Sequence, residues 1–154
     1  MLFLLYFIFM KALIQRVKRA SVTIEGELFS AINFGILVFL GVEKEDEKLN
    51  AEKLAQKIVN LRIFEDENEK MNLSLKDVDG EILVVSQFTL CGDCKKGTRP
   101  SFDKAANPQK AVDLYEYFIK CIKDDNIPVK TGKFRAMMDV ELVNDGPVTF
   151  WLEK

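Results

Sequence analysis

The first part of the chain alternates apolar and polar residues, a pattern that predicts two short strands. They cover residues 11–18 (KALIQRVK) and 21–29 (SVTIEGELF). Within the second segment, Glu25 and Gly26 are typical of a turn. A continuous apolar run bounded by glycines, GILVFLGV, follows at residues 35–42 and predicts a buried strand.

Two later segments carry apolar residues at helical spacing. The first is residues 45–61 (EDEKLNAEKLAQKIVNL), where acidic residues gather at the expected N-terminus. The second begins at Asn107 and Pro108, which are typical of a helix cap and of the first helical position. The apolar faces are expected to comprise Ala51, Leu54, Ala55, Ile58 and Leu61 in the first helix, and Ala111, Leu114, Tyr115, Phe118 and Ile122 in the second.

The strongest strand pattern of the chain lies at residues 81–90 (EILVVSQFTL). The stretch before it, residues 62–80, reads mostly as loop. Three further strands are expected at residues 127–131, 136–143 and 148–152. The tetrapeptide NDGP at residues 144–147 separates the last two strands and predicts a tight turn between them, since strands avoid all four of its residues.

Together these elements amount to about seven strands and two helices in one domain. Their hairpins favour antiparallel or mixed sheets that form a barrel-like layer, with the helices packed outside, an α/β arrangement with α+β character. The domain is expected to cover residues 10–154. The preceding apolar segment, residues 1–9 (MLFLLYFIF), is interpreted as an extension or an upstream start, because Met10 offers a second start. This segment is too short to span a membrane and lacks signal-peptide features, so no membrane partner is expected.

The chain of 154 residues contains no histidine, and its net charge is −2. This composition excludes Ser–His–Asp and Cys–His hydrolases as well as zinc sites that use histidine. The small negative charge provides no general attraction for nucleic acid, so any RNA contact must come from a local basic patch. We expect no metal and no cofactor.

The three cysteines are an odd number, which argues against the disulfide framework of a secreted protein. Cys91 and Cys94 form an isolated CxxC pair, too few ligands for a structural zinc site. Free thiols in a loop are favoured, and a strained loop disulfide stays open as an alternative.

Two motifs stand out in combination: SQFTL at residues 86–90 and NDGPVT at residues 144–149. They are accompanied by MKALIQRVKRASV at 10–22, RIFEDENEKMN at 62–72 and GTRPSF at 97–102. This pattern resembles the D-aminoacyl-tRNA deacylase family, also called D-tyrosyl-tRNA deacylases, along the whole domain. Each motif alone is weak, but the two together are specific.

The resemblance implies an enzyme that hydrolyses the ester between a D-amino acid and the terminal adenosine of tRNA. Glycine, which is achiral, is also removed in this family, whereas L-aminoacyl-tRNA is left intact. Members are homodimers with active sites at the subunit interface, acting on the acceptor end of aminoacyl-tRNA. A cytoplasmic location is expected for such a translation proofreading enzyme.

By the same resemblance, Gly146 and Pro147 form the chirality filter. The bond between them is cis in the family, and the pair enters the active site of the other subunit. An L side chain would collide with this backbone wall, whereas the hydrogen of a D residue or of glycine would not. Arg16 and Asn144 are expected to support the wall; a surface ion pair is the ordinary alternative for Arg16.

The residues expected to line the catalytic site are Ser86, Gln87, Phe88 and Thr89. Without histidine, two mechanisms stay open. Thr89 could act as a nucleophile, although a threonine without a base is weak. The mechanism we favour uses the free 2′-OH of the terminal adenosine to activate water, with backbone N–H groups near Phe88 and Thr89 as donors.

Local clusters of basic residues flank these motifs. Lys95, Lys96 and Arg99 follow SQFTL, and the group Lys130, Lys133 and Arg135 precedes the last strands. They are candidate phosphate contacts for the tRNA acceptor end, or ordinary solvated charges. The main functional alternative is a tRNA-binding or editing-like accessory domain of the same fold without catalytic activity.

Overall fold

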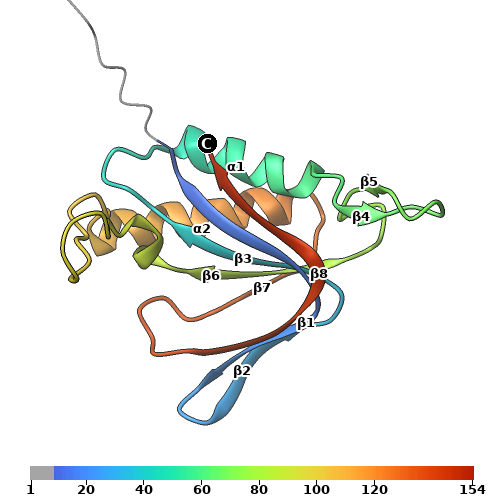
Figure 1. The fold of residues 1–154 in the computed structure, drawn as a ribbon, viewed down its shortest axis with the longest axis horizontal. Coiled ribbons are helices and arrows are strands. Elements are labelled where there is room, and N and C mark those ends of the chain that lie inside the picture. The colour runs from blue at the N-terminus through green and yellow to red at the C-terminus, as the bar shows by residue number, and fades with distance from the viewer. Residues whose placement is uncertain (1–8) are drawn as a thin grey trace, which may run out of the picture.

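The computed structural model describes residues 9–154, which form a six-stranded mixed sheet, a two-stranded hairpin and two α-helices (Figure 1). The strands are β1 (Lys11–Ile24), β2 (Glu27–Ile32), β3 (Gly35–Gly41), β4 (Phe64–Glu65), β5 (Met71–Leu73), β6 (Glu81–Ser86), β7 (Val129–Thr131) and β8 (Asp139–Glu153). The helices are α1 (Lys48–Asn60), α2 (Pro108–Asp124) and the short 3-10 helix η1 (Phe88–Cys91). The predicted apolar segment 1–9 lies, except for its last residue, outside the described residues.

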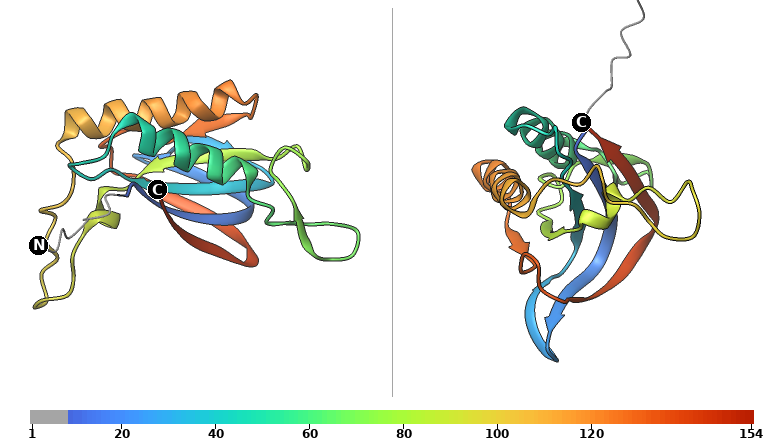
Figure 2. Two further views of the ribbon diagram at one scale, coloured as in Figure 1. Left: turned by 90° about the horizontal axis from the view of Figure 1, so that it is seen from above. Right: turned by 90° about the vertical axis from the view of Figure 1, so that its left-hand side faces the viewer.

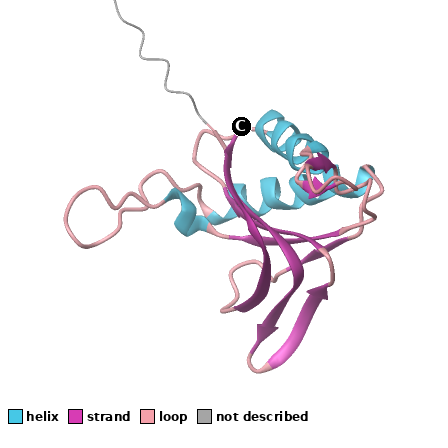
Figure 3. Ribbon diagram, turned by 45° about the vertical axis from the view of Figure 1, so that its right-hand side comes forward, coloured by secondary structure: helices cyan, strands magenta, loops and turns pink. Residues whose placement is uncertain are grey.

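The centre of the sheet is parallel. Strand β3 pairs in parallel with β6, and β6 pairs in parallel with β7. Parallel neighbours need a crossover connection, which α1 provides between β3 and β6 and α2 between β6 and β7. Both helices therefore cover the same face of the sheet, as Figures 2 and 3 show. The predicted class, a barrel-like mixed sheet with two helices outside, is confirmed.

Strand β1 is one continuous strand of 14 residues, so the prediction of two short strands was wrong. The polar pair Lys18-Arg19 suggested a break, yet Arg19 and Ala20 stay paired with β8. One edge of β1 pairs with β8 along nearly its whole length, and the other edge pairs first with β3 and then with β2. The turn predicted at Glu25 and Gly26 does connect β1 to β2.

The chain makes no hairpin at Asn144–Pro147, contrary to the prediction from the NDGP tetrapeptide. Strand β8 continues through it and stays on the edge of β1. Val17 of β1 pairs with Asn144 of β8, and Gln15 pairs with Thr149. Over this stretch β8 has more residues than β1, and the extra residues bulge away from the partner strand. Proline and glycine are tolerated in strands at such irregularities, and the bulge accommodates the same residues that suggested a turn.

Apolar residues are buried on both faces of the sheet. Ile36, Val38 and Leu40 of β3 pack under the helices, while Leu37 joins a second cluster on the opposite face. The second cluster is closed by β2 and the first half of β8, which curl over that face (Figure 2). The prediction that residues 35–42 form a buried strand is confirmed for β3.

Both predicted helices are present. The first is shorter than the predicted 45–61, because α1 begins at Lys48, after the acidic residues, and ends before Leu61. The Asn107 side chain accepts a hydrogen bond of 2.9 Å from the Lys110 N–H, with Pro108 as the first helical residue. Helix α1 starts after Glu47, which forms a capping box with Asn50. Within residues 9–154, no helix has the length and apolar character needed to cross a bilayer.

Candidate active site

Strand β6 ends at Ser86, earlier than predicted, and the chain turns into η1 at Phe88. The strand predicted at residues 81–90 was therefore too long, because only its first six residues form a strand. The N–H of Gln87 still donates to the Leu40 carbonyl at 2.8 Å, which holds the end of β6 against β3. Beyond that bond the backbone leaves the sheet, and Phe88 and Thr89 become exposed.

A cavity of about 580 Å³ opens beside this strand end. We call it the Phe88 cavity. Its walls come from the last residue of β6 and the start of η1 (Ser86, Gln87 and Phe88), the start of α2 (Pro108 and Ala111) and the segment 134–138 before β8. Its volume lies within the ~300–1,000 Å³ that is typical of small-ligand sites. Three of the four predicted catalytic residues thus line one cavity.

Phe88 lies at the opening of the cavity and is 56% exposed, an unusual position for a large apolar side chain. It packs edge-to-face against Phe102, with ring centroids 5.1 Å apart. Phe102 belongs to the GTRPSF segment, so this aromatic contact brings the SQFTL motif and the GTRPSF segment together. Both rings remain partly open to solvent and can contact a planar ligand.

Thr89, the fourth predicted catalytic residue, is not among the cavity-lining residues. Its hydroxyl accepts a hydrogen bond from the Gln87 side-chain amide, which is its one side-chain partner within residues 9–154. An amide cannot remove a proton from threonine. The arrangement therefore provides no base that would make Thr89 a strong nucleophile.

The second motif lies at the bulge of β8. Gly146 and Pro147 are exposed there, and the peptide bond between them is cis. The Asn144 amide braces the bulge by donating to the carbonyl oxygens of Arg16 and Val148, both at 3.0 Å. A side chain at Gly146 would lie 3.1 Å from the Asn144 oxygen, closer than ordinary van der Waals contact.

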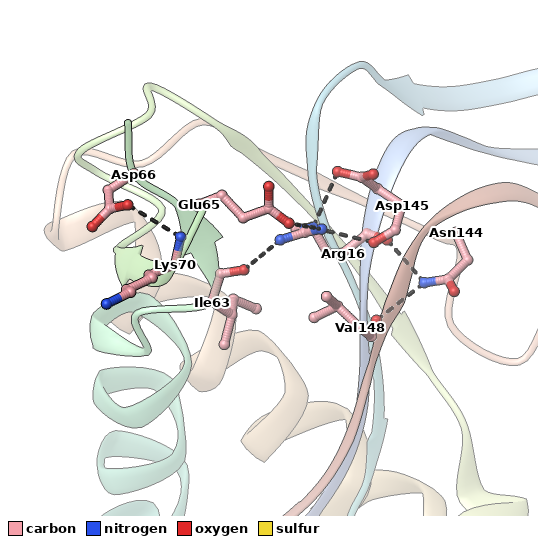
Figure 4. A network of polar contacts seen from close by, with 8 residues as sticks. All are labelled: Arg16, Ile63, Glu65, Asp66, Lys70, Asn144, Asp145 and Val148. Carbon is pink, nitrogen blue, oxygen red and sulfur yellow. Dashed lines mark hydrogen bonds and ion pairs between the residues drawn. The ribbon is translucent and has the colours of Figure 1, made fainter. Parts of the chain in front are cut away.

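Arg16 supports the same bulge from β1 and is almost fully buried, with 3% of its surface exposed. Its Nε lies 3.0 Å from the Asp145 carboxylate and 3.1 Å from the Asp145 carbonyl oxygen. A second guanidinium nitrogen donates to the Ile63 carbonyl at 2.7 Å, and the third lies 3.6 Å from Glu65 (Figure 4). This is not the ordinary surface ion pair that the sequence left open, because the charge is buried and bonded in several directions.

The SQFTL and NDGPVT motifs lie far apart within one chain. Asn144 pairs with Val17, which pairs with Gly35, and Gly35 pairs with Glu81 at the start of β6. Ser86 is at the other end of β6, three strands away. At ~3.3 Å per residue along a strand and ~4.8 Å between strands, the path along the sheet from one motif to the other is about 20 Å, and none of residues 144–147 lines the Phe88 cavity. A single chain therefore does not bring the bulge of β8 to the Phe88 cavity.

The predicted phosphate contacts are all exposed. Lys95, Lys96 and Arg99 belong to the loop after η1, and Lys133 precedes the cavity wall. Of the basic residues considered from the sequence, only Arg135 lines the Phe88 cavity. The sequence did not identify Phe134, Met137 or Met138 as cavity residues. The strand expected from residue 136 begins only at Asp139, and the contacts of the loop before it depend on segments distant in the chain.

All three cysteines are free thiols, so the loop disulfide considered from the sequence is not present. Burial raises the pKa of Cys91 to about 11, and its thiol contacts the Val42 carbonyl. Cys94 is exposed in the loop that follows. Within residues 9–154 no three His, Cys, Asp or Glu residues are grouped so that they could hold a metal ion.

Asp46, between β3 and α1, is buried with 1% of its surface exposed. One carboxylate oxygen accepts a 2.7 Å hydrogen bond from the Glu43 N–H, and the other has no hydrogen-bond partner. Burial in this setting raises the pKa of Asp46 to about 6. Asp46 does not line the Phe88 cavity, and its raised pKa makes the stability of the fold depend on pH.

Comparison with known proteins points to one family. The family model described as D-Tyr-tRNA(Tyr) deacylase matches residues 13–153. The D-aminoacyl-tRNA deacylase of Thermodesulfovibrio yellowstonii is 62% identical over 93% of this chain and 98% of its own length. That of Koribacter versatilis is 60% identical over 94% and 97%.

Solved structures agree in fold. One titled c-Myc DNA Unwinding Element Binding Protein has a TM-score of 0.89 and 46% identity, over 94% of this chain and 98% of that one. A second, titled as a probable eukaryotic D-amino acid tRNA deacylase, has a TM-score of 0.80 over 96% of this chain and all of the other. Its 14% identity supports the shared fold alone.

Proposed function

Because this chain belongs to the D-aminoacyl-tRNA deacylase family, we propose that it hydrolyses D-aminoacyl-tRNA at the Phe88 cavity and selects its substrate through Gly146 and Pro147. The chain is a hydrolase that cleaves the ester between a D-amino acid and tRNA. One observation carries the assignment to this cavity: Ser86, Gln87 and Phe88 of the family-like SQFTL motif line it together.

In the proposed filter, Gly146 and Pro147 present backbone rather than side chains to the substrate's α-carbon. A wall of this kind must be held in place to discriminate. The buried Arg16 and the Asn144 amide supply that support, since both are bonded to the bulge that carries the pair. An L side chain is rejected by collision, and a D residue or glycine is accepted.

The filter must reach the cavity of a second copy of the chain. Gly146 and Pro147 are exposed, do not line the cavity of their own chain, and are about 20 Å from Ser86 along the sheet, by the strand spacings given above. On the same strand, Phe150 and Trp151 are 38% and 47% exposed, and a partner subunit would bury them. These features support a homodimer with two active sites, each built from both subunits.

Hydrolysis adds water to the ester carbonyl carbon, and the bond from that carbon to the ribose 3′ oxygen breaks. The proton lost by water ends on the 3′ oxygen, which leaves a D-amino acid and tRNA with a free 3′-OH. The 2′-OH beside the ester orients and activates the water. The N–H groups of Phe88 and Thr89, which open η1 and have no acceptor within it, stabilise the oxyanion.

Thr89 has a smaller role in this mechanism, because its hydroxyl contacts only a donor amide. Gln87 and Ser86 shape the cavity and offer hydrogen bonds to the substrate. Lys95, Lys96, Arg99 and Lys133, all exposed, attract the phosphates of the acceptor end. Glycine attached to a non-cognate tRNA passes the filter as a D residue does, because it also presents only a hydrogen to the backbone wall.

The deciding experiment follows release of tyrosine from D-Tyr-tRNA and from L-Tyr-tRNA by the purified protein. We expect rapid release from the D ester alone. Release from neither ester would instead support a tRNA-binding domain without catalytic activity. Release from both would mean that Gly146 and Pro147 do not form the filter.

A further inference from the structure

Arg135 is the one charged residue among those that line the Phe88 cavity. The other walls are apolar, apart from Ser86 and Gln87, which are neutral. Its side chain is exposed and makes no hydrogen bond or ion pair within residues 9–154. The guanidinium is thus available to a ligand, and its positive charge is the only one that the cavity walls present.

The backbone of Arg135 is in the left-handed region, with φ +66°. Such a conformation is costly for a residue with a Cβ and is tolerated where the surroundings impose it, often at binding sites. The N–H of Ala136 donates to the Lys133 carbonyl at 3.1 Å, so residues 133–136 form a tight turn at the cavity wall. The turn fixes the direction in which the Arg135 side chain leaves the backbone.

The substrate carries few charges near its reacting ester. The α-amino group of the amino acid is neutral or positive, and the adenine base is neutral. The nearest negative charge is the 5′-phosphate of the same terminal adenosine. An arginine binds phosphate strongly because its planar group can donate two parallel hydrogen bonds.

We propose that Arg135 binds the 5′-phosphate of the terminal adenosine and so positions the ester beside Ser86, Gln87 and Phe88. The inference rests on the proposed function for its substrate. It assigns to Arg135 a contact that the exposed lysines of the 95–99 loop do not make, because those lysines do not line the cavity. Arg135 is a positioning residue, since the phosphate is not a reacting group.

Binding of adenosine 5′-monophosphate and of adenosine tests the proposal without any turnover. Both are titrated into protein labelled on its methionine methyl groups. Met137 and Met138 line the cavity and report binding there, while Met71 on β5 serves as an internal control. We expect the monophosphate to bind wild-type protein about tenfold more tightly than adenosine. Equal affinity of the two, or no shift of the Met137 and Met138 signals, would overturn the proposal.

Variants at the same position separate the guanidinium from the backbone. In Arg135→Gly and Arg135→Ala, the monophosphate and adenosine are expected to bind about equally well. In Arg135→Lys, part of the preference for the monophosphate remains. Glycine suits a positive φ, so Arg135→Gly should have a melting temperature no lower than wild type. Lys123→Ala, an exposed charge near the C-terminal end of α2, is the control and should keep the full preference. A preference retained in Arg135→Gly would contradict the assignment.

Kinetics with D-Tyr-tRNA distinguish this inference from the proposed function. If Arg135 contributes binding alone, Arg135→Gly raises KM about tenfold and leaves kcat close to wild type. A wild-type protein that does not hydrolyse D-Tyr-tRNA would refute the proposed function, while the nucleotide titration would still decide whether Arg135 binds the phosphate. An active wild type whose Arg135→Gly variant has an unchanged KM would refute the positioning role only.

Discussion

The Nε of Arg16 lies 3.0 Å from the carboxylate of Asp145 and 3.1 Å from the carbonyl oxygen of the same residue. One side chain of β1 therefore holds both the backbone and the side chain of the residue that precedes Gly146. Because Arg16 is buried, its other two nitrogens face Ile63 and Glu65 rather than water. The arrangement fixes the bulge of β8 relative to the rest of the sheet.

Arg16→Ala should both destabilise the protein and weaken its selection for D substrates. Loss of a buried partner leaves Asp145 and the Ile63 carbonyl poorly bonded, at a cost of about 3 kcal/mol. Urea unfolding measures the stability, and the ratio of D-Tyr-tRNA to L-Tyr-tRNA hydrolysis measures the selection. Arg19→Ala, an exposed position on the same strand, is the matched control and should change stability by less than about 0.5 kcal/mol. An unchanged ratio in Arg16→Ala would contradict the supporting role.

Asn144→Asp tests the brace with a nearly isosteric change. The amide nitrogen donates to two carbonyl oxygens, whereas an ionised carboxylate can only accept and would face them with like charge. We expect a loss of about 2 kcal/mol in stability at neutral pH and a clear fall in activity on D-Tyr-tRNA. Protonation returns a donor, so part of the stability should reappear at low pH. A variant as stable as wild type at pH 7 would argue against the brace.

Thr89→Ala separates the two mechanisms. If the 2′-OH of the terminal adenosine activates water, the variant keeps most of its activity, within about tenfold of wild type. A covalent threonine mechanism would instead require near-complete loss. The complementary substrate is D-Tyr-tRNA that ends in 2′-deoxyadenosine, with the amino acid on the 3′ oxygen. Its hydrolysis should be slower by about 100-fold or more with the wild-type enzyme.

Mixed dimers test whether each site is built from two subunits. Gly146→Leu places a bulky side chain at the filter, and Ser86→Trp fills the cavity, so each homodimer should be inactive. A heterodimer isolated by two different tags contains one cavity and one filter that are both intact. In a cross-subunit site these meet, and about half of the wild-type activity returns. A heterodimer with no activity would mean that the residues act within one subunit.

Asp46 predicts a pH dependence of stability. Its pKa is raised from 3.8 to about 6 in the folded protein, so the folded state binds the proton more tightly than the unfolded state. The contribution of Asp46 to stability therefore falls as the pH rises from about 4 to about 6, and the loss is complete above that range. Asp46→Asn keeps an acceptor for the Glu43 N–H without a charge. It should match wild type near pH 4 and be more stable by about 1–2 kcal/mol at pH 8. Urea unfolding at pH 4 and pH 8 measures the difference in stability between Asp46→Asn and wild type. The same difference at both pH values would contradict the raised pKa of Asp46.

The sequence by itself determined the elements whose signals are local. Helix α2 starts at Asn107 and Pro108 as predicted, because capping depends on neighbouring residues alone. The buried run of β3 was evident because both faces of a parallel strand are covered. The SQFTL and NDGPVT motifs also identified the family, since their combination is specific enough without any geometry.

The tertiary structure decided what depends on partners distant in the chain. Asn144–Pro147 has the composition of a turn, but the neighbouring β1 offers enough pairing on both sides to keep β8 extended with a bulge. In the same way, pairing with β8 carries β1 through Lys18 and Arg19. The burial of Arg16 and the position of Arg135 in the cavity wall also follow from packing between distant segments. Composition and spacing describe only near neighbours along the chain, whereas a site is built from side chains that the fold brings together.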